Sequence, residues 1–289
     1  MNDETSFKHD YAQIGGVRLH YVTAGAGEKL VVLLHGFPEF WYSWRNQIPV
    51  LSEQYTVVAP DLRGYNLSDK PTSKSDYEVE KIGDDILGLI RHFGREQAAV
   101  VGHDWGAIVG WRLAQKHPDS ISKLCAMQVP PTSVWRKNQT LRQFLASWYM
   151  FFFQLPILPE LLISANDFAA LEKSLRSTSA RPEVFTDEVL EEYKKSWRET
   201  ENMTGAINYY RANILKRLFS KQSTDEKIKV PTLFIYGEQD QAILPQTVRG
   251  VSEAVEAPFS EFRIANAAHW VQQEAAADVN EVLLDFLAD

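Results

Sequence analysis

The sequence predicts an α/β fold in which helices cover a mostly parallel, doubly wound sheet that a helical insertion interrupts. Over residues 29–129, apolar strand-like runs alternate with amphipathic helical patterns, as expected for parallel strands joined by helices. Residues 132–222 are helical and rich in aromatic side chains, without a clear strand pattern. A buried-strand pattern then resumes at residues 228–236, so two separate stretches of chain are expected to form one sheet.

The first part of the sheet is expected to contain a hairpin strand, where polar and apolar residues alternate, and then continuous apolar strands. The predicted strands are residues 17–22, 29–34, 55–60, 97–101 and 121–129. One helix is predicted around residues 44–51. A second is predicted from Ile82, Ile86, Leu89, Ile90 and Phe93, which recur at helical spacing before Gly94.

The second part of the sheet is expected to add strands at residues 228–236 and 261–264, followed by an amphipathic closing helix around residues 279–287. Pro130 and Pro131 break the pattern of the first part. We therefore expect a core formed by residues 1–131 and 223–289, and a helical cap, or lid, formed by residues 132–222.

Composition limits the possible functions. A chain of 289 residues with 45% hydrophobic content can bury a sizeable core. The net charge of −8 argues against a nucleic-acid partner. The single cysteine, Cys125, excludes an internal disulfide framework and a cluster of thiolates for a metal. The sequence also contains no phosphate-binding loop. We therefore expect neither a cofactor nor a metal. The polar start of the chain does not look like a secretory signal, and we expect a cytoplasmic protein.

One stretch, residues 144–163, has the apolar character of a membrane span. Gln154, Pro156, Pro159 and Glu160 interrupt it, whereas a spanning helix needs about 20 nearly unbroken apolar residues. We therefore expect a buried or pocket-lining segment and no membrane insertion.

The stretch Val100–Ala107 ends an apolar strand in a turn with Asp104 at its tip. Gly102 and Gly106 on either side permit a tight crossing from strand to helix, which is the geometry of a nucleophile elbow. An aspartate is already anionic at neutral pH and can attack a saturated carbon, which produces an ester. Alternatively, Asp104 caps the helix that follows, and the motif alone does not decide between the two.

Two further side chains follow Asp104 in a chain order that indicates a catalytic site. Asp240 follows the strand at 228–236, and His269 follows the last strand. Nucleophile, acid and then histidine is the chain order of α/β-hydrolases. His269 is the predicted base because it alone follows the acid, whereas His35 and His103 are expected to be turn residues with satisfied hydrogen bonds.

The loop at residues 35–40 follows a strand that is expected to end beside the elbow. Its Phe37 backbone N–H, together with that of Trp105, is predicted to form an oxyanion hole. A simple strand-terminating turn is compatible with that role. The loop at residues 61–71 is interpreted as structural.

These motifs resemble those of soluble epoxide hydrolases of the α/β-hydrolase superfamily, over nearly the full length. The matching segments are His35–Glu39, Asp61–Tyr65, Gly102–Gly106 and Asn208–Arg211. Ala107 and the Ala267-Ala268 pair depart from the family pattern without removing a reacting group. The resemblance implies a cis Phe37–Pro38 peptide, and it implies that Tyr149 and Tyr210 are the catalytic tyrosine pair of the cap.

The implied reaction converts a hydrophobic epoxide and water to a vicinal diol. Asp104 would attack a ring carbon while Tyr149 and Tyr210 bind the epoxide oxygen. His269, oriented by Asp240, would then activate the water that hydrolyses the ester. Tyr209 is expected only to pack. Several aromatic residues are predicted to line an apolar substrate pocket, and they are Trp41, Phe151, Phe152 and Trp270.

Alternatives remain open at this point. Haloalkane dehalogenases share the aspartate elbow but need a second halide donor, and Phe37 has no side-chain donor. Fluoroacetate dehalogenases carry an arginine where this chain has Trp105. A serine esterase is disfavoured because the elbow has no serine. A hydrolase fold that only binds a small ligand is a further alternative, and both a monomer and a homodimer are open.

Overall fold

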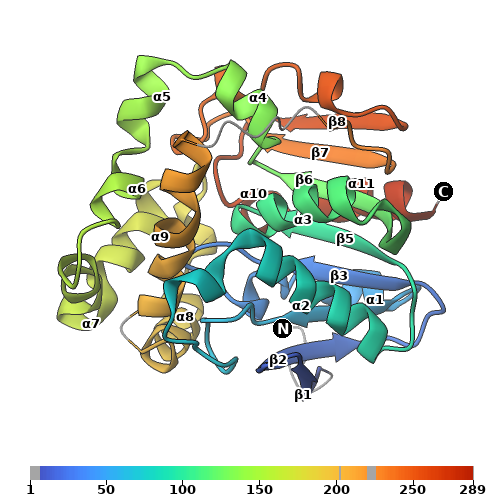
Figure 1. Cartoon of the computed structure of the whole chain (residues 1–289), viewed down its shortest axis with the longest axis horizontal. Helices are drawn as coiled ribbons and strands as arrows, with labels where there is room; N and C mark the ends of the chain where they lie inside the picture. The colour runs from blue at the N-terminus through green and yellow to red at the C-terminus, as the bar shows by residue number, and fades with distance from the viewer. Residues whose placement is uncertain (1–6, 202, 220–225, 289) are drawn as a thin grey trace.

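The computed structural model describes residues 7–201, 203–219 and 226–288, and in these residues one eight-stranded sheet forms the centre of the molecule (Figure 1). The strand order is β1-β2-β4-β3-β5-β6-β7-β8, and all neighbours are parallel except that β2 runs antiparallel to β1 and β4. The strands are β1 Lys8–Ile14, β2 Val17–Ala24, β3 Leu30–Leu34, β4 Thr56–Pro60, β5 Ala98–His103, β6 Ile121–Met127, β7 Thr232–Gly237 and β8 Phe259–Ile264. The predicted fold class is confirmed.

The central strands form where the sequence is continuously apolar. Every residue of β3, β5 and β7 is buried, as expected for parallel strands covered on both faces. β1 was not predicted, because it lies at an edge and only Ala12 of its residues is buried, so its sequence carries no apolar alternation. The predicted strand at 228–236 begins later, at Thr232, after Pro231, which cannot donate to a sheet.

The core helices are α1 Ile48–Ser52, α2 Val79–His92, α3 Trp105–Lys116, α10 Val271–Glu274 and α11 Ala276–Ala288. α2 packs beside α3 in front of the sheet in Figure 1, and α1 contacts α11. Gly94, with φ +66°, follows the end of α2, as predicted. The helix predicted at residues 44–51 is divided between η2, which ends at Trp44, and α1, which begins at Ile48 with Pro49 in its first turn. Short 3₁₀ helices are η2 Trp41–Trp44, η3 Lys74–Tyr77, η4 Pro118–Ser120, η5 Pro182–Val184, η6 Pro245–Val248 and η7 Val251–Ala254.

Six α-helices of the described residues lie between β6 and β7, and all but α4, which lies near the top centre, form the left side of the molecule in Figure 1. They are α4 Thr132–Lys137, α5 Leu141–Ala146, α6 Trp148–Phe152, α7 Leu158–Ser177, α8 Asp187–Glu199 and α9 Thr204–Phe219. The first of these helices, α4, begins at Thr132, directly after the Pro130-Pro131 pair. The predicted boundary at residues 222–223 lies outside the described residues.

The apolar segment at residues 144–163 is buried or lines a cavity only in part, whereas the sequence predicted this for the whole segment. Phe153 and Ile163 are buried, and Phe144, Tyr149, Met150 and Phe151 line a cavity. Many of its other large side chains are exposed instead, with Trp148 63% exposed. Within the described part of the chain, no helix combines the length and the apolar character that crossing a membrane requires.

Candidate active site

Asp104 lies in the sharp turn between β5 and α3. Its backbone has φ 52° and ψ −114°, a conformation rarely adopted by residues other than glycine. The turn is too tight for side chains on either side, because a Cβ at Gly102 would overlap the carbonyl of Gly106 and a Cβ at Gly106 would overlap that of Leu34. The Asp104 side chain makes no capping hydrogen bond to α3, so the alternative of a simple helix cap does not describe it.

The Asp104 carboxylate faces the loop that follows β3. The Phe37 backbone N–H donates to Asp104 Oδ1 at 2.9 Å. Gly36 allows this approach, because a Cβ there would overlap the Asp104 side chain. The Phe37–Pro38 peptide is cis, as the family resemblance implies. Trp105 provides the first residue of α3, directly after Asp104.

His269 lies between Asp104 and Asp240. Its Nδ1 is 2.8 Å from Asp240 Oδ2, and its Nε2 is 3.9 Å from Asp104 Oδ2. The other Asp240 oxygen, Oδ1, accepts the backbone N–H groups of Ala242 at 2.7 Å and Ile243 at 2.9 Å. These bonds fix the Asp240 carboxylate, which in turn fixes the orientation of the imidazole.

Burial and charge act in opposite directions on His269. Burial disfavours the imidazolium, but the charge and hydrogen bond of Asp240, followed by the charges of Asp104 and Glu39, raise its pKa to about 9. A pKa of about 9 favours the protonated imidazole at neutral pH. Loss of the Asp104 charge would remove one of the negative charges that stabilise the proton on His269.

Gln128 is a site residue that the sequence interpretation missed, because it appeared to belong to the strand predicted at 121–129. It lies one position beyond β6 with φ 67°. Its Nε2 donates to Asp240 Oδ2 at 2.8 Å and to the Ala268 carbonyl at 2.6 Å, and its Oε1 accepts the Gly237 N–H at 2.7 Å. One amide thus joins the two loops that carry Asp240 and His269.

Glu39 and His103 form a second buried connection behind the imidazole. His103 Nε2 lies 2.7 Å from the His269 carbonyl, and its Nδ1 lies 3.1 Å from Glu39 Oε2. Glu39 is fully buried and accepts hydrogen bonds from Tyr193, Gln272 and Gln273. Sequence reasoning noted Glu39 only as part of a motif.

The two histidines predicted to be structural have satisfied ring nitrogens. His103 bonds to Glu39 and to the His269 carbonyl. His35 Nδ1 lies 3.0 Å from the Gly36 carbonyl, and its Nε2 accepts the Leu62 N–H at 3.0 Å. The satisfied hydrogen bonds predicted for both are confirmed, although His103 is the last residue of β5 and does not lie in a turn.

The loop at residues 61–71 also has the predicted structural role. Arg63 forms a bidentate ion pair with Asp85 of α2, with N–O distances of 2.6 and 2.5 Å. Asp61 lies 2.6 Å from the His20 imidazole and accepts hydrogen bonds from Trp41 N–H and the Asn66 amide. These buried contacts tie the loop to β2 and α2.

A cavity of about 190 Å³ connects Asp104 with the helical insertion. Asp104, Trp105, Tyr149 and Tyr210 line it at one end. The most exposed lining residues, at the other end, are Gln139, Phe144 and Phe151. Most of the lining is apolar, so the cavity suits a hydrophobic molecule.

Tyr149 of α6 and Tyr210 of α9 lie beside each other in this cavity, with ring centroids 5.9 Å apart. Burial, and then the negative charge of Asp104, raise the pKa of both phenols, so both are protonated at neutral pH. A hydrogen bond with the Trp105 side chain acts in the opposite direction on the pKa of Tyr210. Tyr209 points elsewhere and donates to the Arg63 carbonyl at 2.9 Å, which confirms its packing role.

Phe151 lines the cavity as predicted, but Trp41, Phe152 and Trp270 do not. Phe152 follows Phe151 on a helix, where successive side chains point in different directions, and it packs against Trp148 and Phe153. Trp270 packs perpendicular to His269 and donates to Thr178 Oγ1 at 2.9 Å.

Trp41 lies still further from the cavity, in η2, where its ring contacts Phe7 and His9 of the first strand region. Aromatic character alone therefore did not identify the lining residues.

In the described part of the chain, no group of three or more His, Cys, Asp or Glu side chains has the arrangement of a metal site.

A parallel sheet with an aspartate elbow, an acid and a histidine after three of its strands defines an α/β-hydrolase. The sequence matches the alpha/beta hydrolase fold family over residues 29–276, and the chain belongs to that family. Within it, the chain belongs to the epoxide hydrolases, as the motifs indicated. It is 38% identical to Epoxide hydrolase 1 of Caenorhabditis elegans over 96% of this chain and 69% of that protein.

Two further comparisons agree on the family. The AB hydrolase superfamily protein YfhM of Bacillus subtilis is 39% identical, with 97% of this chain and 98% of that protein aligned. The crystal structure of Bacillus megaterium epoxide hydrolase in complex with an inhibitor matches this fold with a TM-score of 0.88 and 32% identity, covering 97% of this chain and all of that one.

Proposed function

We propose that this protein hydrolyses a hydrophobic epoxide to a vicinal diol through an ester of Asp104, with residues 132–222 as the cap over a core of residues 1–131 and 223–289. The observation that carries the proposal is the composition of one cavity. It holds a carboxylate backed by His269 and Asp240, and two protonated phenols, Tyr149 and Tyr210. The named epoxide hydrolases among its relatives support the same reaction.

In the first step, Asp104 Oδ2 attacks a ring carbon and the carbon–oxygen bond of the epoxide breaks. We assign the attack to Oδ2 because Oδ1 is engaged by the Phe37 N–H. The departing oxygen takes a proton from Tyr149 or Tyr210, and that phenol regains a proton from water after the product leaves. Phenols suit this role because they stay protonated at neutral pH, yet are far more acidic than the alcohol that forms.

In the second step, water cleaves the ester. Alkylation removes the charge of Asp104, which lowers the pKa of His269, so the imidazolium releases its proton to water and becomes the neutral imidazole that can act as base. Water then attacks the ester carbon and His269 takes its proton. The oxyanion that forms on Oδ1 is stabilised by the Phe37 and Trp105 N–H groups, each worth roughly 3 kcal/mol by analogy with other oxyanion holes.

When the tetrahedral intermediate collapses, the alkoxide leaves with the proton from His269. The remaining hydroxyl proton on Asp104 then passes to the neutral imidazole, which regenerates the carboxylate, with one oxygen from water, and the imidazolium. Asp240 balances the imidazolium during this step. Each turnover therefore consumes one epoxide and one water and releases one diol, and it needs no cofactor. We further propose a cytoplasmic site of action, in keeping with the single buried thiol of Cys125.

Single turnover of excess protein with styrene oxide in oxygen-18 water tests the ester mechanism. We expect diol formation together with one labelled oxygen in the peptide that carries Asp104, detected by mass spectrometry after digestion. Diol without label in that peptide would refute the ester and favour direct attack by water. Failure to convert any epoxide, with halide released from halogenated alkanes, would assign the site to a dehalogenase. Ligand binding without any turnover would indicate a binding protein.

A further inference from the structure

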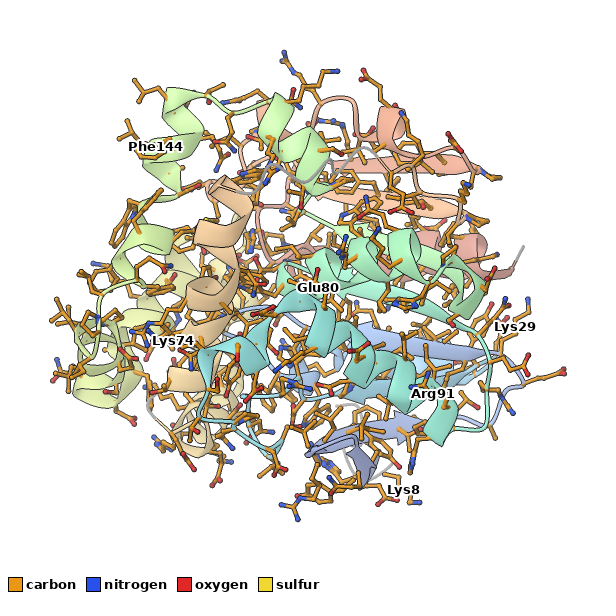
Figure 2. All side chains as sticks on the ribbon, in the orientation of Figure 1. Lys8, Lys29, Lys74, Glu80, Arg91 and Phe144 are labelled. Atoms are coloured by element: carbon orange, nitrogen blue, oxygen red, sulfur yellow. The ribbon has the colours of Figure 1, made fainter. Side chains whose placement is uncertain are left out.

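The helical insertion exposes an unusual amount of apolar surface. Among the described residues, twelve large hydrophobic side chains are exposed, and ten of them fall within residues 141–162. Figure 2 shows Phe144 projecting from α5 at the edge of the molecule. We call these ten residues the cap patch, and they are Leu141, Phe144, Leu145, Trp148, Phe151, Leu155, Ile157, Leu158, Leu161 and Leu162. A concentration of this kind marks an interaction surface, because single exposed apolar residues are otherwise scattered.

The cap patch is continuous with the cavity of the candidate active site. Phe144 and Phe151 belong to both, with side chains that are 52% and 37% exposed while they also line the cavity. Tyr149, which lies between them in the sequence, faces Asp104 at the other end of the same cavity. The cap patch therefore meets the exposed end of the cavity at Phe144 and Phe151.

The charge of this region is opposite to that of the whole chain. Residues 132–162 contain three cations, Arg136, Lys137 and Arg142, and one anion, Glu160, so their formal charge is +2 while the protein carries −8. Glu160 is buried and paired with Arg211 at 2.5 Å. Lys137 is paired with Glu253, whereas Arg142 is exposed and makes no ion pair with a described residue. The exposed charges of this segment are all positive.

We propose that the cap patch docks reversibly on an anionic lipid surface, with the outer end of the cavity facing the lipid. Short amphipathic helices bind in the interfacial plane when apolar side chains enter the boundary of the acyl chains and cations contact anionic headgroups. Trp148, 63% exposed, is of the residue type that prefers this boundary. No helix needs to cross the bilayer.

Docking at lipid would deliver substrate directly. A hydrophobic epoxide concentrates in the bilayer, and the continuity of patch and cavity gives it a path to Asp104 that avoids water. This benefit depends on the proposed function, but the docking itself does not. The surface chemistry alone predicts lipid binding even for a protein without epoxide hydrolase activity.

A second copy of the chain fits the patch less well. In a two-fold symmetric dimer the same surface meets itself, so the exposed cations of the two copies would approach each other. Such a dimer would also cover Phe144 and Phe151, which form the outer end of the cavity. An anionic lipid surface satisfies both the apolar and the charged part of the patch.

The test is co-sedimentation of the full chain with vesicles of phosphatidylglycerol or phosphatidylcholine. The double variant Leu145→Gln/Trp148→Gln changes two exposed patch residues that do not line the cavity. The matched control is Leu67→Gln, at an exposed leucine outside the patch. We expect the wild type and the control to bind phosphatidylglycerol vesicles equally, and the double variant to bind about tenfold or more weakly. Arg142→Glu should weaken binding to phosphatidylglycerol and not to phosphatidylcholine.

We expect each variant to fold, because all the changed side chains are exposed, and circular dichroism and thermal unfolding check this. The proposal is overturned if the wild type does not sediment with either vesicle, or if the double variant binds as well as the control. It is also overturned if analytical ultracentrifugation without lipid shows a dimer that the double variant loses, with no binding to vesicles. Vesicle binding without epoxide turnover would refute the proposed function and leave the docking intact.

Discussion

His269 Nε2 lies 3.9 Å from Asp104 Oδ2, too far for a hydrogen bond and close enough for a strong charge interaction. The distance leaves Asp104 Oδ2 available for the attack that we propose. It also couples the protonation of His269 to the chemical state of Asp104. The ester of Asp104 no longer carries the negative charge of the carboxylate, so its formation in the proposed mechanism favours the neutral imidazole that acts as the base of the second step.

Asp104→Asn tests this coupling directly. Removal of the carboxylate charge should lower the pKa of His269 from its value of about 9, because one of the charges that raise it is lost. NMR titration of the His269 ring protons measures the shift. His9 is the internal control, because burial, His20 and Asp61 act on its pKa and Asp104 does not. Epoxide turnover should fall by about a thousandfold or more. An unchanged pKa of His269 would contradict the coupling.

His269→Gln should separate the two steps. Asp104 still forms the ester, but without the base its hydrolysis should slow by about 10³-fold. Intact-protein mass spectrometry after mixing with styrene oxide should then show a lasting adduct of one substrate mass, which the wild type shows only briefly. If the variant forms no adduct at all, His269 is needed for alkylation and its proposed role is wrong.

The tyrosine pair can be tested against a neighbouring tyrosine. Tyr149→Phe and Tyr210→Phe should each slow ester formation by about 10- to 100-fold, because one proton donor to the epoxide oxygen is lost. Stopped-flow measurement of alkylation detects this loss. Tyr209→Phe is the matched control, because its hydroxyl donates to the Arg63 carbonyl outside the cavity, and its cost should be about 1 kcal/mol of stability with unchanged alkylation. Equal losses in all three variants would exclude a specific role for the pair.

Stability should depend on pH through His269. Its folded pKa, about 9, lies above the ordinary value of 6.5, so its protonated form stabilises the fold. This contribution, on the order of 3 kcal/mol, is fully present below pH 6.5 and is lost as pH rises through about 9. Urea unfolding of the wild type and of His269→Gln between pH 6 and 10 measures it. A difference in unfolding free energy that stays constant over this range would refute the raised pKa.

The fold was predictable where local sequence determines the environment. Buried parallel strands need continuous apolar runs, and the elbow needs Gly102 and Gly106, so both are visible in the sequence. β1 could not be predicted, because a polar edge strand has no apolar face to detect. The exposure of residues 141–162 was also hidden, since an apolar composition is the same for a buried helix and for an interaction surface.

The proximity of Asp104, His269 and Asp240 followed from chain order, but the residues that hold them in place did not. Gln128 and Asp240 are 112 positions apart, and Glu39 and Gln273 are 234 apart. Their contacts exist because β6 pairs with β7 and because α10 returns to the loop after β3. Pairing of this kind depends on the packed core, so a buried amide such as Gln128 has no sequence signature of its own.

Gln128→Ala should show what this amide contributes. The variant leaves the buried Gly237 N–H and Ala268 carbonyl without their partner and opens a cavity, so it should destabilise the fold by about 2–4 kcal/mol. Because Gln128 touches Asp240 and not Asp104, ester hydrolysis should slow more than ester formation, by about tenfold. Pre-steady-state kinetics separates the two rates, and Gln139→Ala, at the exposed end of the cavity, is the control. Equal slowing of both steps would make Gln128 a purely structural residue and remove it from the site.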